Sequence, residues 1–158
     1  GYDIWGTTDA FRYVFQSLTG DGQIVARVAS IQNTDPSAKS GVMIRETLTN
    51  NSAYALMTLS PGKAANFQRR LISGGDYIPT PTLARPNVSA PYWVKLVRNG
   101  NTISGYVSAD GAVWQLVGSD SIFMTGTVYI GMPVTSHLYG TLCTAIIDGV
   151  VVTNVISP

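Results

Sequence analysis

The stretch Tyr92–Ser108, which reads YWVKLVRNGNTISGYVS, decides the fold. Apolar and polar residues alternate on both sides of the pair Asn99-Gly100, and a period of two residues is that of a β-strand with one buried face. Asn-Gly between two alternating runs is the strongest short-range signal for a hairpin, because a type I′ turn requires positive φ at both central residues. The stretch therefore predicts two antiparallel strands joined by a tight turn at residues 99–101.

The same two-residue period continues outward in both directions, and no segment has convincing helical periodicity. Further strands are predicted near residues 11–16, 24–28, 42–45, 53–59, 66–72, 113–117, 127–135 and 143–155. This amounts to about eleven to thirteen short strands with turn signals every 8–12 residues, a spacing typical of sandwiches and jelly rolls. We therefore expect an all-β chain that forms one two-sheet antiparallel β-sandwich of the jelly-roll type over residues 1–158.

One segment departs from this pattern. Residues 73–91 contain Pro79, Pro81, Pro86 and Pro91. Proline has no N–H to donate to a ladder, so the segment cannot be a central strand. It is predicted to be a long surface loop, and long loops on rigid sheets are common places for binding.

The composition narrows the class of protein. The chain has 158 residues, of which 45% are hydrophobic and only 12% charged, and its formal net charge is +1. Such a balance argues against capture of nucleic acid, and no apolar run is long enough to cross a membrane as a helix. The single cysteine, Cys143, cannot form an internal disulfide and is predicted to be a small core residue. We expect a module of a larger secreted bacterial protein.

The residues that could carry catalysis are few. The chain has one histidine, His137, and one glutamate, Glu46, among nine carboxylates. It contains no nucleophile elbow, phosphate-binding glycine loop or zinc-binding His-Glu-x-x-His motif. A pair such as Asp9 and Glu46 could flank a glycosidic bond, but no local motif links the two. We therefore expect a binding module rather than an enzyme.

Alternation along the strands also indicates which side chains point away from the core. If Ile24, Val42, Val94 and Ile103 face the core, their polar neighbours face outward. The strand at 66–72 is ambiguous, since either Gln68 and Arg70 or Arg69 could point outward. The outer face of one sheet is then predicted to carry Arg27, Arg45, Arg70, Trp93, Lys95 and Tyr106.

The side chains predicted on this face suit a glycan. Aromatic rings stack on sugar rings, and the guanidinium groups of arginines donate paired hydrogen bonds to hydroxyls or carboxylates, so an acidic glycan is one option. The alternative is that the arginines pair with carboxylates and the aromatic rings cover the sheet.

Two loop regions are further candidates. Trp5 lies between the carboxylates of Asp3 and Asp9, and His137 and Tyr139 share a predicted turn. Asp148, at the start of the last predicted strand, could hold a structural calcium ion together with Asp3 and backbone oxygens. The alternatives are that Asp148 is an ordinary turn residue and that the lone histidine is a structural hydrogen-bonding group.

The chain resembles the concanavalin-like, laminin-G-like domains of the DUF1349 family of bacterial secreted proteins. The stretches that carry the resemblance are Asp3–Phe11, Gly20–Val28, Gly41–Glu46, Phe67–Arg70, Tyr92–Arg98, Tyr106–Gly111 and Val134–His137. They run in order along nearly the whole chain, although residues 79–91 have no counterpart. The resemblance implies a two-sheet jelly roll and a carbohydrate-binding role beside polysaccharide-degrading enzymes, and it assigns no individual binding residue.

We therefore predict a non-catalytic carbohydrate-binding module that targets a covalently linked catalytic domain to a polysaccharide. Two rivals remain, an adhesion or spacer module that binds protein or neighbouring domains, and a glycoside hydrolase or lyase. The predicted ligand-binding residues are Trp5, Arg45, Glu46, Tyr54, Arg70, Trp93, Lys95, Tyr106, His137 and Tyr139, and the predicted calcium ligands are Asp3 and Asp148.

Overall fold

The computed structural model describes residues 1–62, 64–76 and 84–154 and contains strands and turns only. Its strands are β1 (Asp3–Trp5), β2 (Thr8–Ala10), β3 (Arg12–Thr19), β4 (Gly22–Ile31), β5 (Lys39–Arg45), β6 (Tyr54–Ser60), β7 (Ala64–Arg70), β8 (Arg85–Pro86), β9 (Tyr92–Asn99), β10 (Thr102–Ser108), β11 (Gln115–Ser121), β12 (Thr127–Thr135) and β13 (Ala145–Asn154). No helix that could span a membrane is found among these residues.

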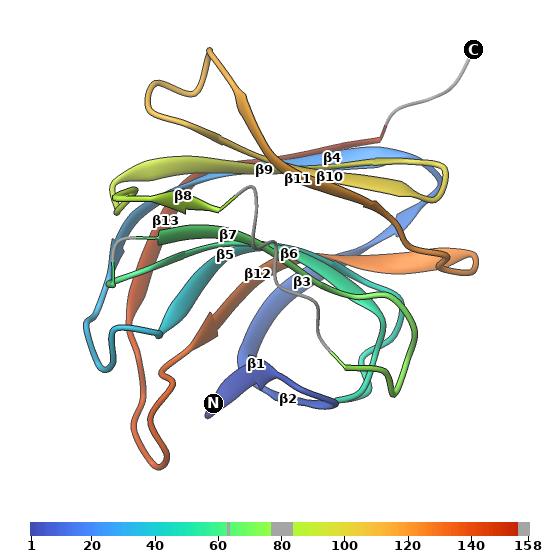
Figure 1. Ribbon diagram of the computed structural model, residues 1–158. Coiled ribbons are helices and arrows are strands. Elements are labelled where there is room, and N and C mark those ends of the chain that lie inside the picture. Colours follow the sequence, from blue (N-terminus) through green and yellow to red (C-terminus); the bar gives the residue numbers. More distant parts are fainter. Residues whose placement is uncertain (63, 77–83, 155–158) are drawn as a thin grey trace.

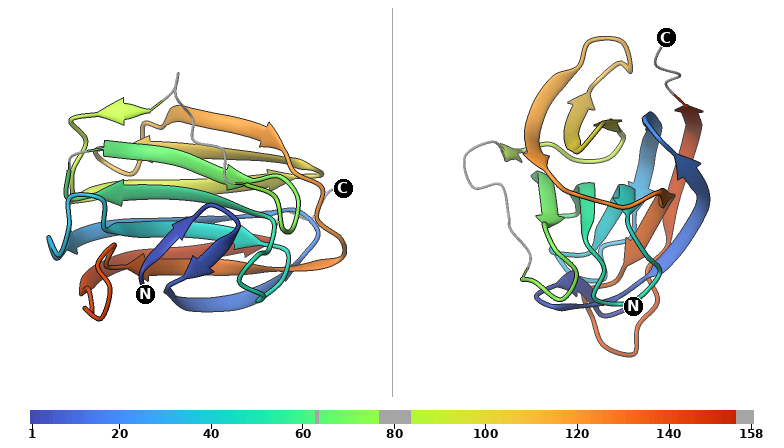
Figure 2. Two further views of the ribbon diagram at one scale, coloured as in Figure 1. Left: turned by 60° about the horizontal axis from the view of Figure 1, so that its bottom comes forward. Right: turned by 90° about the vertical axis from the view of Figure 1, so that its right-hand side faces the viewer.

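The strands form two antiparallel layers and one small hairpin (Figure 1). One layer has the strand order β11-β10-β9-β4-β13, and the other has the order β3-β12-β5-β6-β7-β8. The hairpin β1–β2 lies against the six-stranded layer, on the side away from the five-stranded one (Figure 2). The predicted two-sheet antiparallel sandwich is confirmed.

The decisive stretch forms the hairpin β9–β10, as predicted, although its turn differs in type. Asn99 pairs with Thr102, so the two central residues are Gly100 and Asn101. Gly100 has a φ of 58°, and Asn101 is not among the residues with positive φ. One positive φ at the first central position is the requirement of a type II′ turn rather than type I′.

The main core lies between the two layers and confirms the predicted alternation. Ile24, Val94 and Ile103 come from the five-stranded sheet, Val42 and Phe67 from the six-stranded sheet, and all are buried in one cluster. Because successive side chains in a strand point to opposite faces, the neighbours of these residues point to the outer faces of the two sheets. In β7 the outward residues are Gln68 and Arg70, which resolves the ambiguity at 66–72.

A second, smaller core explains why the hairpin β1–β2 stays on the sheet. Ile4 is fully buried against Met43, Tyr54 and Leu56, which point outward from β5 and β6. All of β5 is buried, on both of its faces. The six-stranded sheet is therefore covered by the main core on one face and, over part of the other, by this hairpin.

The structure also tests the expectations for Cys143 and for the proline-rich segment. Cys143 is only partly buried and its thiol lies 3.4 Å from the Gln32 carbonyl, so the prediction of a core residue is wrong. The proline-rich segment contributes the short edge strand β8, which pairs with the start of β7. Pro79 and Pro81 lie outside the described residues.

Candidate functional site

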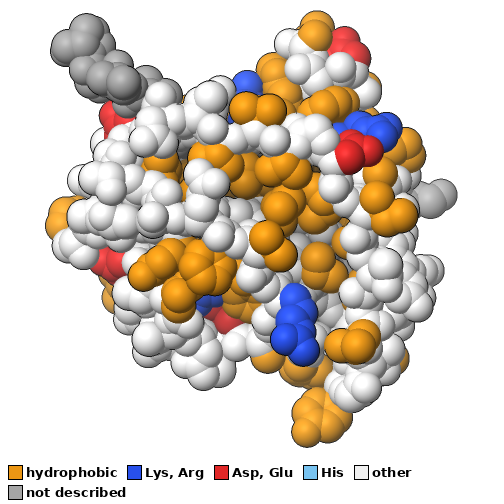
Figure 3. Space-filling view, turned by 180° about the vertical axis from the view of Figure 1, so that it is seen from behind, with side chains coloured by type: hydrophobic (Ala, Val, Ile, Leu, Met, Phe, Trp, Pro, Cys, Tyr) orange, Lys and Arg blue, Asp and Glu red, His pale blue; other side chains and the backbone are white. Residues whose placement is uncertain are grey.

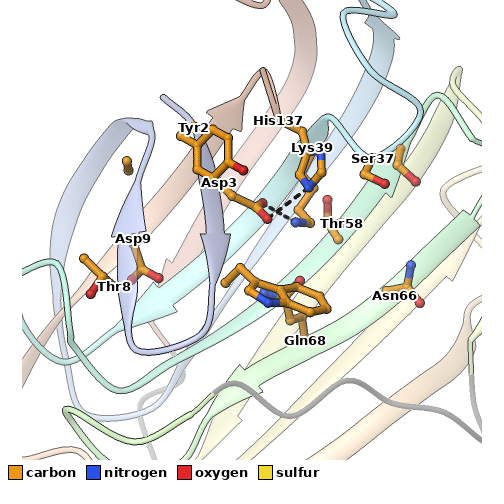
Figure 4. Close-up of a pocket in the computed structure, with 13 residues that line it drawn as sticks. Tyr2, Asp3, Thr8, Asp9, Ser37, Lys39, Thr58, Asn66, Gln68 and His137 are labelled. Atoms are coloured by element: carbon orange, nitrogen blue, oxygen red, sulfur yellow. Dashed lines mark hydrogen bonds and ion pairs between the residues drawn. The ribbon is translucent and has the colours of Figure 1, made fainter. Parts of the chain in front are cut away.

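A large cavity lies where the hairpin β1–β2 meets the outer face of the six-stranded sheet (Figure 4). Its volume is about 660 Å³, which is within the range of small-molecule sites. We call it the hairpin pocket, and it is lined by Tyr2, Asp3, Trp5, Thr8, Asp9, Ala10, Ser37, Lys39, Thr58, Ser60, Asn66, Gln68 and His137. The hairpin supplies one wall and strands β5, β6 and β7 supply the floor.

A buried ionic cluster holds the hairpin in place. The Arg70 guanidinium donates two hydrogen bonds to the Asp9 carboxylate, at 2.7 and 2.9 Å, and another to the Gly6 carbonyl at 2.7 Å. The Arg45 guanidinium lies 3.4 Å from the same carboxylate and donates to the carbonyls of Thr47 and Thr49. Since none of these three charged side chains is exposed by more than 2%, the cluster is satisfied internally rather than by solvent.

Burial affects the pKa of both guanidiniums, with opposite outcomes. Desolvation lowers the pKa of Arg45, and the nearby Asp9 charge only partly offsets this. Desolvation is also the largest single influence on Arg70, but the hydrogen bonds to Asp9 and the negative charge of that carboxylate, with smaller contributions from Tyr54 and Asp76, together outweigh it, so the pKa of Arg70 is raised. Burial raises the pKa of the Tyr54 hydroxyl, which accepts a hydrogen bond from Gln68 Nε2 at 2.6 Å. Both arginines are charged and Tyr54 is neutral near neutral pH.

A second polar cluster lies at the other end of the pocket, where Figure 4 shows Asp3, Lys39 and His137 pointing toward one another. The Lys39 ammonium forms a hydrogen-bonded ion pair with Asp3. His137 Nε2 lies 3.2 Å from Asp3, and its Nδ1 lies 3.1 Å from Asp35. A φ of 52° at His137 turns its ring into this position. The loop after β12 is thereby joined to strand β1.

Aromatic rings and unpaired polar groups complete the lining. Trp5 is 52% exposed, and the Lys39 ammonium lies 5.6 Å from its ring centroid. The Tyr2 ring stacks on His137 with a centroid distance of 6.1 Å. Within the part of the chain that the structure describes, the hydroxyl and amide groups at the pocket with no hydrogen-bond partner are those of the side chains Tyr2, Thr8, Ser37, Ser60 and Asn66.

The structure corrects three predicted ligand-binding residues. Arg45 and Arg70 point outward from the main core, as predicted, and so does Tyr54, but the hairpin covers all three and they are fully buried. Their polar groups already bond to Asp9, Gln68 and backbone carbonyls. None of the three lines the hairpin pocket, which they support from behind.

The predicted single face is also wrong, because its members belong to two sheets. Trp93, Lys95 and Tyr106 lie on the outer face of the five-stranded sheet, on the opposite side of the main core from Arg45 and Arg70. The Lys95 ammonium is 4.8 Å from the Tyr106 centroid and 4.1 Å from that of Trp114, and burial lowers its pKa. Trp93, Lys95 and Tyr106 therefore belong to a different surface from the one that carries Arg45 and Arg70.

The remaining predicted residues are dispersed. Trp5 and His137 line the hairpin pocket, and Tyr139, which is 88% exposed, contacts the Tyr2 ring edge-on. Glu46 lies outside the pocket and accepts hydrogen bonds from the Thr125 amide and hydroxyl, both at 3.1 Å.

The predicted calcium pair is not formed. Asp148 makes two hydrogen bonds with Arg27 on the five-stranded sheet, whereas Asp3 is engaged by Lys39 beyond the six-stranded one. No group of three or more His, Cys, Asp or Glu side chains suited to a metal occurs among the residues described.

Sequence reasoning missed the polar floor of the pocket, above all Lys39, Thr58, Ser60 and Asn66. A signal for it existed in the run Ala53–Leu59, which is apolar at nearly every position. A continuous apolar run is typical of a strand covered on both faces. It indicated that something must lie on the outer face of this sheet.

No protein-family model and no curated protein sequence matches the chain. Among solved structures, a functionally unknown protein from Saccharomyces cerevisiae has a TM-score of 0.74 at 15% identity, over 98% of this chain and 84% of that protein. The carbohydrate-binding module CBM66 from Bacillus subtilis has a TM-score of 0.60 at 13% identity, over 94% and 92%. A xylan β-1,4-xylosidase from Bacillus halodurans has a TM-score of 0.62 at 14% identity, over 89% of this chain and 30% of the enzyme. The chain thus shares its two-sheet β-sandwich fold with a carbohydrate-binding module and with a segment of a longer xylosidase.

Proposed function

We propose that this chain is a carbohydrate-binding module whose ligand site is the hairpin pocket. The observation that carries the proposal is the convergence of the rings of Trp5 and Tyr2 with unpaired hydroxyl and amide groups in one cavity of about 660 Å³. Sugar rings present an apolar C–H face and a rim of hydroxyls. An aromatic wall beside amide and hydroxyl groups complements both features.

The charges at the pocket favour an uncharged glycan. Lys39 is neutralised by Asp3, and Asp9 by Arg70 and Arg45. An acidic glycan would need a basic side chain that is not already paired, because a cation that already has a carboxylate partner contributes little binding free energy to a second anion. The unpaired groups that remain, among them Asn66, Ser60 and Thr8, are neutral.

The role is proposed to be non-catalytic. Asp3 and Asp9 are the carboxylates that line the pocket, and each is held by a basic side chain. Hydrolysis of a glycoside requires one carboxyl group to donate a proton and the other to act as base or nucleophile. Carboxylates fixed in ion pairs are poorly placed for either task.

The wider setting is part of the same proposal. The fold is shared with a carbohydrate-binding module and with a segment of a longer xylosidase. We therefore infer a secreted module of the kind suggested by the DUF1349 resemblance, which raises the local concentration of polysaccharide for a linked catalytic domain.

Affinity gel electrophoresis tests the proposal directly. The chain is run against neutral glycans, namely xylan, hydroxyethylcellulose, galactomannan and mixed-linkage β-glucan, and against alginate, polygalacturonate and κ-carrageenan. Retardation by a neutral glycan is expected. Trp5→Ala should weaken it about tenfold or more, since a lost aromatic wall removes more than about 1.4 kcal/mol of binding free energy.

The matched control is Trp114→Ala, which removes the same ring from the outer face of the other sheet and should leave retardation unchanged. Binding should also be insensitive to added salt, because screening acts on charges. Absence of retardation by every glycan, with the protein shown to be folded, would overturn the proposal and favour an adhesion or spacer role.

A further inference from the structure

A second cavity lies on the other side of strand β2 from the hairpin pocket. Its volume is about 280 Å³, and we call it the aromatic cavity. It is lined by Asp9, Ala10, Phe11, Tyr13, Phe15, Arg45, Leu48 and Asn50. Asp9 and Ala10 also line the hairpin pocket, so the two cavities meet at β2.

A row of four aromatic rings forms the floor of this cavity and extends beyond it. The centroids of Phe11 and Tyr13 are 5.6 Å apart, those of Tyr13 and Phe15 are 5.2 Å apart, and Phe15 meets Tyr129 edge-on at 5.4 Å. The first three come from alternate positions of one stretch and therefore share a face. Strand β3 is the edge strand of the six-stranded sheet on the back of the molecule, and the view from behind shows many hydrophobic side chains on that face (Figure 3).

The row is fixed at one end and open at the other. The Tyr13 hydroxyl donates to the carbonyls of Met43 and Tyr129, at 3.1 and 3.0 Å, and the Arg45 guanidinium lies 5.0 Å from the Phe11 ring centroid. Phe15 and Leu48, by contrast, are 44% and 51% exposed. Rigid rings bind with little loss of conformational entropy, and the exposed end leaves room for a ligand.

Asp9 and Arg45 at this cavity are paired with each other and the Tyr13 hydroxyl is already bonded, so the polar side chain left for a ligand is the neutral amide of Asn50. The Asn50 carbonyl accepts a hydrogen bond from the Asp9 amide at 2.7 Å, which anchors the residue. Its side-chain amide has no hydrogen-bond partner within the described ranges. A fixed aromatic row beside an amide has the same chemistry as the hairpin pocket, on a smaller scale.

We infer that the aromatic cavity is a second subsite for the same uncharged polysaccharide, so that one chain crosses β2 and occupies both cavities. The inference rests on the function proposed above. Its consequence is recognition of the interior of a chain rather than of the chain end alone. Two linked contacts should also make affinity rise with ligand length, because the second contact forms within the complex.

Isothermal titration calorimetry with neutral oligosaccharides of two and six units separates the two subsites. Xylo-, cello- and manno-oligosaccharides serve as probes. Within the series of oligosaccharides that the chain binds, the six-unit ligand should bind more tightly than the two-unit ligand. Phe15→Ala should lower affinity for the six-unit ligand about tenfold and leave the two-unit ligand unaffected, whereas Trp5→Ala should weaken both.

Leu48→Ala serves as a second variant of the aromatic cavity and Phe123→Ala as a control, since Phe123 is exposed on a strand connection outside both cavities. Equal affinities for long and short ligands, or a six-unit affinity unchanged by both Phe15→Ala and Leu48→Ala, would overturn the second subsite while leaving the first intact. Failure of all oligosaccharides to bind the unaltered protein would instead remove the proposed function itself.

Discussion

Asp9 is the residue on which the site depends. Its carboxylate is fully buried and is the counter-ion of Arg70 and, at longer range, of Arg45. Asp9→Asn should therefore leave two buried guanidiniums without a negative partner. Removing one member of a buried ion pair costs about 3–5 kcal/mol, and we expect a loss of unfolding free energy of that order in urea denaturation.

A matched control for this prediction is Asp148→Asn. Asp148 also forms a two-point ion pair, with Arg27, but both side chains are well exposed. Exposed pairs contribute little because solvent screens them, so this variant should lose much less stability than Asp9→Asn. Equal losses would contradict the view that burial makes the Asp9 cluster important.

Asp110 is expected to contribute a pH dependence to stability. Hydrogen bonds from the amides of Val113 and Ala112 and from the Ser108 hydroxyl lower its pKa to about 2. A carboxyl whose pKa falls on folding stabilises the protein above its unfolded pKa, and this contribution is lost as the pH falls toward the folded pKa. Part of the stability of the chain should therefore disappear between about pH 4 and pH 2.

Asp110→Asn isolates this contribution, because an asparagine oxygen can accept the same hydrogen bonds but does not titrate. Its unfolding free energy should fall less steeply than that of the unaltered chain over the same acidic range, as followed by urea denaturation at several pH values. Identical pH profiles for the two proteins would show that the turn at Asp110 does not contribute.

At the scale of strands, the sequence predicted which way side chains point but not what they meet. Alternation correctly directed Val42 and Ile44 to the core and Arg45 away from it. It could not show that a hairpin near the N-terminus folds back over Arg45, because that contact joins residues more than thirty positions apart. Sheet membership was equally hidden, since β4 pairs with β9 and β13, both distant along the chain.

The hairpin β1–β2 should accordingly control binding. Ile4 anchors it in the second core, while its neighbours Asp3 and Trp5 line the hairpin pocket. Ile4→Ala should lower the unfolding free energy by about 2–5 kcal/mol, as truncation of buried aliphatic side chains does. It should also weaken glycan binding at temperatures where the variant remains folded, because the wall of the pocket loses its attachment.

Ile103→Ala provides the comparison, since Ile103 is equally buried but lies in the main core. A similar loss of stability with unchanged affinity is expected for it. If Ile103→Ala weakened binding as much as Ile4→Ala, the effect would reflect general destabilisation and the hairpin would have no special part in recognition.

At the scale of the whole molecule, the sandwich has two outer faces separated by its core. The hairpin pocket belongs to the six-stranded face, and Trp93 belongs to the five-stranded face. Trp93 packs closely against two turn glycines, since a Cβ added at Gly111 or Gly149 would come within 2.9 or 2.6 Å of its ring. Both glycines have positive φ. This packing gives Trp93 a structural role that is independent of the pocket.

Replacing each of the two tryptophans, Trp93 and Trp5, separately with alanine should therefore distinguish a role in stability from a role in binding. Trp93→Ala removes a ring packed on two turns, so its melting temperature should fall while its retardation by a neutral glycan stays unchanged. Trp5→Ala removes a half-exposed ring from the pocket, so it should lose binding with little change in melting temperature. Affinity gel electrophoresis and thermal denaturation of the same samples provide both readouts. If Trp93→Ala abolished retardation while still folded and Trp5→Ala did not, the five-stranded face would be the binding surface, and the aromatic group around Lys95 would replace the hairpin pocket as the site.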